Sequence, residues 1–133
     1  LHEIGLLIEY KQYHKHTAYI LENTDMPGFS QSEHKLITAV ANEHRSDLIK
    51  HSFDHLGCHK QLAECLARIV RVAVILSMRR QDDVLPLLDL SVNENILTLT
   101  FDGDWLKYHP LMASELQLES KLQAKVGWKL IVK

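Results

Sequence analysis

The hydrophobic period of the chain changes at Pro86, and this change constrains the fold more than any other feature. Before it, apolar residues recur every three to four positions, as on one face of a helix. After it, apolar and polar residues alternate, which is the period of a strand with one buried face. Helices followed by strands predict an α+β fold with two subdomains, residues 1–81 and residues 82–133.

The first subdomain is predicted to be a layer of helices. The predicted helical segments are residues 1–8, residues 11–23, a helix that opens at Ser30, and residues 59–78. Ser30 and Glu33 match a capping box, in which each side chain binds a backbone amide of the other residue. The longest helix has an apolar side made by Leu62, Leu66, Ile69, Ala73 and Leu76.

The second subdomain is predicted to be a small ββαβ unit. Leu88, Leu90 and Val92 begin a hairpin whose polar turn is residues 93–95. Helical spacing returns over residues 110–126, and Gly127 then precedes a last strand. The sheet is expected to be mainly antiparallel.

Composition excludes several classes of protein. The charged fraction is 24% and the net charge is −2, so overall charge favours neither nucleic acid nor an anionic membrane. No apolar run approaches the roughly 18–20 residues that cross a bilayer. Cys58 and Cys65 would lie about two helical turns, roughly 10 Å, apart, which is too far for a disulfide. We expect reduced core thiols in a cytoplasmic protein.

The adjacent His2 and Glu3 resemble the His-Asp signature of HD-type metal phosphohydrolases. In such a site, imidazole and carboxylate hold a divalent metal that activates water. His14, His16 and His44 are candidates for further ligands. The second position is Glu rather than Asp, however, and residues 71–80 hold no acid where an HD site needs its last ligand. We therefore expect an HD-like fold without a metal, with His2, Glu3, His14 and His16 as weak metal candidates only.

Three more histidines, His51, His55 and His59, are spaced four residues apart and would align on a helix. Ser52 and Gly57 make this stretch typical of a loop, so we expect solvation rather than a metal site.

A family resemblance covers essentially the whole chain. Residues 13–29, placed directly after Leu-His-Glu-Ile-Gly at residues 1–5, closely resemble the C-terminal region of the exopolyphosphatase/guanosine pentaphosphate phosphatase family. Residues 79–83 and 127–130 fit the same region less specifically. Within the first run, His14, Tyr19 and Phe29 are expected to pack helices together.

The resemblance implies a fragment of a longer, Mg²⁺-dependent enzyme that removes terminal phosphate from polyphosphate or from guanosine pentaphosphate. In that family the catalytic carboxylates and phosphate loops lie in N-terminal actin-like domains, so no catalytic residue is assigned here. The fragment alone is expected to be inactive and to bind no cofactor. Its implied roles are to grip the anionic substrate and to form a homodimer.

Arginines on the long helix are the candidate substrate-binding residues. They are Arg68, Arg71, Arg79 and Arg80. The planar guanidinium donates two parallel hydrogen bonds to phosphate and keeps its charge. The alternative is a solvated or salt-bridged face, with Glu64, Asp82 and Asp83 as partners. For the chain as a whole, the alternatives are an autonomous HD-type metal phosphohydrolase and a purely structural dimerisation module.

Overall fold

A computed structural model describes residues 1–8, 11–77 and 86–133 of the chain. The chain divides into two compact units, Leu1–Val70 and Arg71–Lys133, which we name the first and the second unit. The subdomain boundary predicted between residues 81 and 82 lies outside the described residues. Helices precede strands in the element order, as the change of hydrophobic period predicted, and the fold is α+β.

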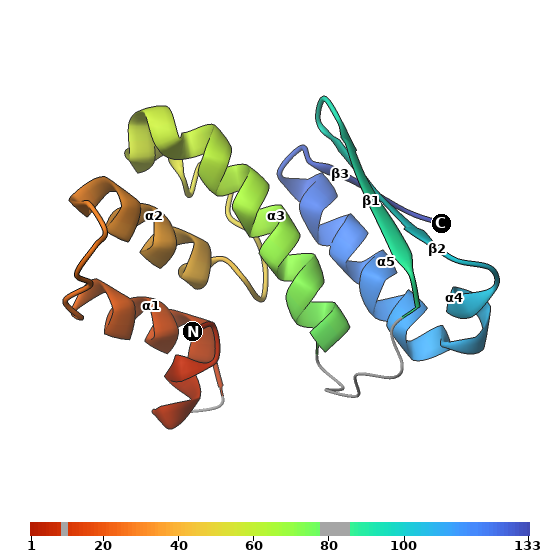
Figure 1. Cartoon of the computed structure of the whole chain (residues 1–133), viewed down its shortest axis with the longest axis horizontal. Coiled ribbons are helices and arrows are strands. Elements are labelled where there is room, and N and C mark those ends of the chain that lie inside the picture. Colours follow the sequence, from red (N-terminus) through yellow and green to blue (C-terminus); the bar gives the residue numbers. More distant parts are fainter. Residues whose placement is uncertain (9–10, 78–85) are drawn as a thin grey trace. The chain divides into compact units, whose positions relative to one another are not determined.

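The first unit is helical (Figure 1). Its elements are the 3₁₀ helix η1 (Ile4–Leu7), α1 (Tyr13–Glu22), α2 (Gln31–Asn42), the 3₁₀ helix η2 (Asp54–His59) and the first turns of α3 (Lys60–Ser77). Helices α1 and α2 pack against each other as an antiparallel pair. The helix predicted over residues 1–8 is only the short η1, because the amide of Gly5 donates outside it, to Thr17 Oγ1.

A capping box opens α2, as predicted. Ser30 Oγ accepts from the amide of Glu33 at 3.1 Å, and Glu33 Oε2 accepts from the amide of Ser30 at 2.7 Å. The two bonds satisfy amides that have no partner within the helix itself. The chain therefore enters α2 at a fixed residue.

The apolar side predicted for α3 is not its buried side. Leu62 is 52% exposed and Ile69 is 36% exposed, whereas Ala63 and Ala67 are fully buried. Alanines let the helix backbone approach its neighbours closely, and larger side chains on that face would prevent this. The face of α3 with the larger apolar side chains is therefore not the face that is buried.

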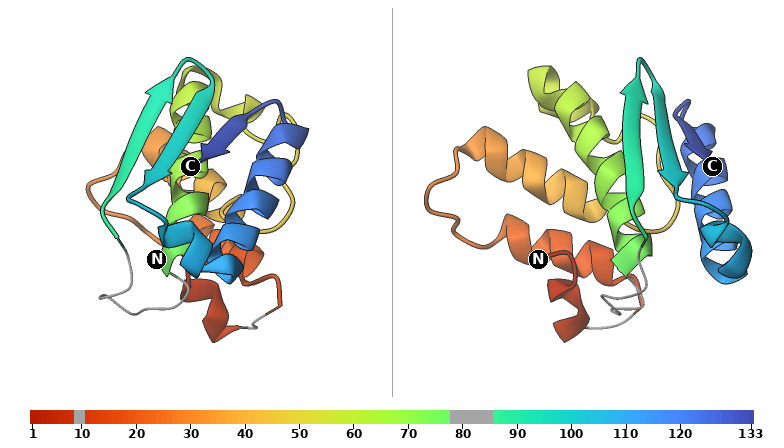
Figure 2. Two further views of the ribbon diagram at one scale, coloured as in Figure 1. Left: turned by 90° about the vertical axis from the view of Figure 1, so that its right-hand side faces the viewer. Right: turned by 45° about the vertical axis from the view of Figure 1, so that its right-hand side comes forward.

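The second unit contains a three-stranded sheet in the order β1-β2-β3 (Figure 2). Its elements are β1 (Leu88–Asn93), β2 (Ile96–Phe101), α4 (Trp105–Tyr108), α5 (Pro110–Lys125) and β3 (Lys129–Val132). Strands β1 and β2 form the predicted antiparallel hairpin, while β3 is parallel to β2, so the sheet is mixed. Parallel strands need a crossover connection, and α5 supplies it.

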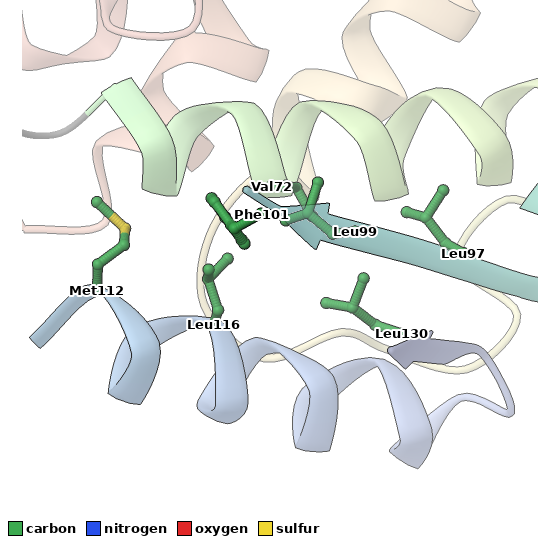
Figure 3. Close-up of a cluster of buried hydrophobic side chains, with 7 residues drawn as sticks. All are labelled: Val72, Leu97, Leu99, Phe101, Met112, Leu116 and Leu130. Atoms are coloured by element: carbon green, nitrogen blue, oxygen red, sulfur yellow. The ribbon is translucent and has the colours of Figure 1, made fainter. Parts of the chain in front are cut away.

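The core of the second unit gathers side chains from every layer (Figure 3). Its members are Val72 of α3, Leu97, Leu99 and Phe101 of β2, Met112 and Leu116 of α5, and Leu130 of β3. The three β2 side chains alternate along the strand, so one face of the sheet is turned toward the helices. This cluster fixes α5 on the sheet.

A ring stack at the end of β2 was not predicted. The rings of Phe101 and Trp105 lie 5.1 Å apart with an interplanar angle of 8°, and those of Trp105 and His109 lie 4.0 Å apart at 15°. The short helix α4 that carries Trp105 has four residues, too few for a periodic signal. The stack adds aromatic contacts to the edge of the core.

The two cysteines are free, as predicted, but Cys58 and Cys65 are both exposed, so the expectation of core thiols was wrong. Cys65 lies on α3 with the exposed Leu62 and Ile69, whereas Cys58 belongs to η2. Among the described residues, no helix combines the length and the apolar character that spanning a membrane requires.

Removing the capping hydroxyl tests the start of α2. Ser30→Ala is expected to lower the free energy of unfolding of the first unit by about 1 kcal/mol, because the Glu33 amide loses its acceptor. Ser32→Ala, an exposed serine within the same helix, is the matched control and should change stability little. Urea unfolding monitored by circular dichroism measures both, and equal effects would contradict the capping role.

Candidate functional site

Three histidines meet beside the predicted metal motif. The ring centroid of His44 lies 5.4 Å from that of His2 and 6.2 Å from that of His14. His14 is 6% exposed and His44 is 2% exposed. His2 Nε2 lies 3.9 Å from Glu3 Oε1. Of the residues predicted as weak metal ligands, the structure thus brings His2, Glu3 and His14 into one region together with His44.

The neighbours of this histidine cluster do not suit a cation. The Tyr13 ring lies 5.5 Å from the His44 ring, and the guanidinium carbon of Arg45 lies 4.9 Å from the centre of the Tyr13 ring. A fixed positive charge so close opposes the arrival of a divalent metal. Across the described residues, no three His, Cys, Asp or Glu side chains are grouped so that they could hold a metal ion. A metal-free cluster stays a prediction.

Gly5, which ends the Leu-His-Glu-Ile-Gly motif, has a steric role. A Cβ atom at Gly5 would lie 2.0 Å from the carbonyl oxygen of Tyr13 and 2.5 Å from the amide nitrogen of Thr17. The Gly5 amide donates to Thr17 Oγ1 at 2.9 Å, and the Thr17 hydroxyl in turn lies 3.0 Å from the carbonyl oxygen of His2. Thr17 is fully buried. The motif therefore places η1 directly on α1, and this close approach brings His2 toward the other two imidazoles.

The histidines at 51, 55 and 59 do not form a site. His51 has a φ of 67°, and its Nδ1 lies 3.1 Å from Asp54 Oδ2. Lys60 Nζ donates to the same carboxylate at 2.6 Å, and this bond lowers the pKa of Asp54. His55 and His59 belong to the 3₁₀ helix η2, so the three rings are not aligned on one α-helix. The stretch is therefore a 3₁₀ helix interrupted at Gly57 rather than the predicted loop, and the local contacts form an exposed network at the start of α3.

Two of the four arginines predicted to bind substrate are buried. Arg68 is 8% exposed and Arg71 is 2% exposed. Burial lowers the pKa of the Arg68 guanidinium below its ordinary value, although the group stays charged at neutral pH. Arg79 and Arg80 lie outside the described residues. A substrate-binding role of these arginines stays a prediction.

Arg71 makes a bidentate ion pair within the second unit. Its Nε donates to Glu119 Oε1 at 2.6 Å and its Nη2 donates to Glu119 Oε2 at 3.1 Å. Gln123 Nε2 donates to the same carboxylate at 3.0 Å, and Gln123 is fully buried. Arg71 is therefore salt-bridged, as the alternative proposed, but the pair is buried. Its partner is Glu119 and not one of the acids predicted from the sequence. Glu119 and Gln123 continue the helical spacing of the buried Met112 and Leu116, a signal that could have identified them.

Comparison with known proteins agrees with the resemblance found in the motifs. Residues 1–120 match the model of the family described as Ppx/GppA phosphatase, domain III. The chain belongs to the Ppx/GppA phosphatase family. This match spans the helical unit and most of the second unit.

Two curated relatives of this Ppx/GppA domain carry the name guanosine-5'-triphosphate,3'-diphosphate pyrophosphatase. One from Pseudoalteromonas translucida (strain TAC 125) is 70% identical over 132 residues, which is 99% of this chain and 27% of the relative. Another from Aeromonas hydrophila subsp. hydrophila is 44% identical over 129 residues, 96% of this chain and 26% of the relative. The chain therefore spans about a quarter of the length of these relatives.

The steric role of Gly5 in this Ppx/GppA domain can be tested directly. Gly5→Ala is expected to destabilise the first unit by about 3 kcal/mol or more, because the new methyl group overlaps the backbone of α1. Gly28→Ala is the control: Gly28 has a φ of +91° but open space around it, so strain of about 1 kcal/mol is expected. Thermal unfolding followed by circular dichroism compares the two. A Gly5→Ala protein as stable as the control would contradict the close approach.

The buried pair of the Ppx/GppA domain has a distinct energetic signature. Arg71→Met is expected to lower the free energy of unfolding of the second unit by about 3–5 kcal/mol, because it leaves the Glu119 carboxylate buried without its cation. The double variant Arg71→Met/Glu119→Leu should recover most of that loss, because both charges are then gone. Chemical denaturation of the wild type, of the single variants Arg71→Met and Glu119→Leu, and of the double variant measures the four free energies of unfolding. A double variant that is the sum of its single variants would show that the two side chains do not depend on each other.

Proposed function

We propose that this chain is a non-catalytic domain of a hydrolase that removes terminal phosphate from guanosine pentaphosphate. The observation that carries the proposal is the 70% identity with a guanosine-5'-triphosphate,3'-diphosphate pyrophosphatase across 99% of the chain. At this identity the fold and its buried contacts are shared, and the domain serves the same kind of parent enzyme. The catalytic machinery is proposed to lie in the part of the parent that this chain does not span.

The contacts inside the chain support a non-catalytic role. A phosphohydrolase site needs a nucleophile or an activated water, a base and charge stabilisation in one place. The imidazoles of His14 and His44 are buried against each other and against Tyr13, and Arg71 is held by Glu119. These groups are engaged in the interior rather than gathered around a substrate. The observations favour this proposal over an autonomous HD-type phosphohydrolase.

Further properties of the parent enzyme belong to the same proposal. We propose that Mg²⁺ acts in the catalytic part of the parent, outside this chain, and that the enzyme is a cytoplasmic homodimer. Polyphosphate is the second proposed substrate, since it shares the terminal phosphoanhydride chemistry. Gripping of substrate and formation of the dimer are the proposed contributions of the domain itself.

Measurements of phosphate release distinguish catalysis by the parent enzyme from the substrate-gripping role proposed for this domain. The full-length enzyme is expected to release phosphate from guanosine pentaphosphate, whereas the 133-residue chain alone should release none. The reason is that we find no nucleophile, base and charge-stabilising group gathered in one place among the described residues. A full-length enzyme from which this domain has been deleted should show a KM raised by about ten-fold or more, if loss of one or two charge-assisted contacts weakens substrate binding. Sedimentation of the same proteins reports the oligomeric state.

Two outcomes would count against the proposal. Phosphate release by the isolated chain that disappears in His2→Ala would instead support an autonomous HD-type enzyme. An unchanged KM together with a lost dimer in the deleted protein would leave the domain as a structural dimerisation module only.

A further inference from the structure

A groove in the first unit is lined by residues of α1 and α2. Its volume is about 850 Å³, within the range of roughly 300–1,000 Å³ that small-molecule sites occupy. Helix α1 buries Tyr13, His14, Thr17 and Leu21 and leaves its other face to the groove. The lining includes Lys15, Tyr19, Glu22, Lys35, Asn42 and Glu43.

The aromatic member of this groove is exposed. Tyr19 was expected to pack helices together, but its side chain is 64% exposed and lines the groove. Lys15 stands one turn before it on α1, so the two side chains share a face of the helix. An exposed ring beside an ammonium group is the combination that receives a nucleobase and its phosphates.

The charges of the groove argue against a simple polyanion. Lys15 and Lys35, one from each helix, supply two ammonium groups. Glu22 and Glu43 line the same space, and negative charge there would repel a chain made only of phosphates. Glu43 is 5% exposed and its Oε1 accepts from Asn42 Nδ2 at 3.1 Å, so the exposed carboxylate of the groove is that of Glu22. Carboxylates accept hydrogen bonds and donate none when ionised. A ligand that suits Lys15, Lys35 and Glu22 must carry negative charge at one end and N–H donors at the other.

We propose that this groove binds a guanine nucleotide, with the base against Tyr19 and the phosphates near Lys15 and Lys35. Guanine presents two neighbouring donors, N1–H and the N2 amino group, that a carboxylate accepts, whereas adenine lacks the N1 donor. The inference rests on the proposed function, because it names the nucleoside part of a guanosine substrate as what this domain recognises. It assigns the recognition to a groove whose described lining includes neither Arg68 nor Arg71.

Calorimetric titration of the 133-residue chain tests the groove. The probes are GTP, ATP and tripolyphosphate, which separate the base from the phosphates. GTP is expected to bind at least about five-fold more tightly than tripolyphosphate, since stacking of one base contributes that much or more. GTP is also expected to bind more tightly than ATP, since only guanine offers an N1–H donor to a carboxylate. Binding of GTP should weaken as salt is raised, because two exposed ammonium groups contribute.

Substitutions in the groove separate the contribution of the Tyr19 ring to binding from that of the two ammonium groups. Tyr19→Ala should weaken GTP binding at least about five-fold and leave tripolyphosphate unchanged. Lys15→Gln/Lys35→Gln should weaken GTP and tripolyphosphate together by about ten-fold. The matched controls are Tyr108→Ala and Lys121→Gln, an exposed tyrosine and an exposed lysine of the second unit, which should change nothing. Circular dichroism confirms that each variant is folded.

GTP that binds no more tightly than tripolyphosphate, or a Tyr19→Ala protein that equals its Tyr108→Ala control, would overturn the inference. GTP bound no better than ATP would overturn the assignment to guanine. Failure of the proposed function looks different: the full-length enzyme would then release no phosphate from guanosine pentaphosphate, whatever the groove of the isolated chain binds. If the enzyme is active and Tyr19→Ala leaves its KM unchanged, the groove is not where the substrate is recognised.

Discussion

Arg71 and Glu119 form a bidentate ion pair inside the second unit, and the elements around them have to hold two charges out of water. Such a pair is tolerated only when its geometry is close and its remaining lone pairs are satisfied, which is why Gln123 also donates to the carboxylate. The pair links the last turns of α3 to α5, and α5 is the crossover that lets β3 run parallel to β2. The sheet and its apolar core therefore depend on a polar contact, which the pattern of apolar residues in the sequence does not predict.

A second close contact organises the first unit. Gly5 and Thr17 meet where a single added methyl group would overlap backbone atoms, and the imidazoles of His2, His14 and His44 gather beside this contact. A motif that resembles a metal signature is here part of how a short 3₁₀ helix is attached to α1. The same residue types can serve chemistry in one protein and assembly of the fold in another, because both uses need a few polar groups held at fixed distances.

Local signals in the sequence predicted local structure well. The capping box at Ser30, the hairpin and the order of helices and strands depend on neighbouring residues, and they are found as expected. Which face of α3 is buried depends on partners far away in the chain, and there the larger apolar residues, Leu62 and Ile69, were misleading. The ion-pair partner of Arg71 could not be predicted for the same reason, since Glu119 is 48 residues away in the chain. Tyr19 was expected to pack because it is aromatic, yet an aromatic ring is also what an exposed ligand surface uses.

The residues with distinctive spectroscopy and reactivity are divided between the two units. Both cysteines, Cys58 and Cys65, lie in the first unit and are exposed, whereas both tryptophans, Trp105 and Trp128, lie in the second. Thiol labelling therefore addresses one unit alone, and indole emission reports the other alone. A dye attached at either thiol would accept energy from the indoles, so the native chain already carries the donors and the attachment points for following the separation of its two halves in solution.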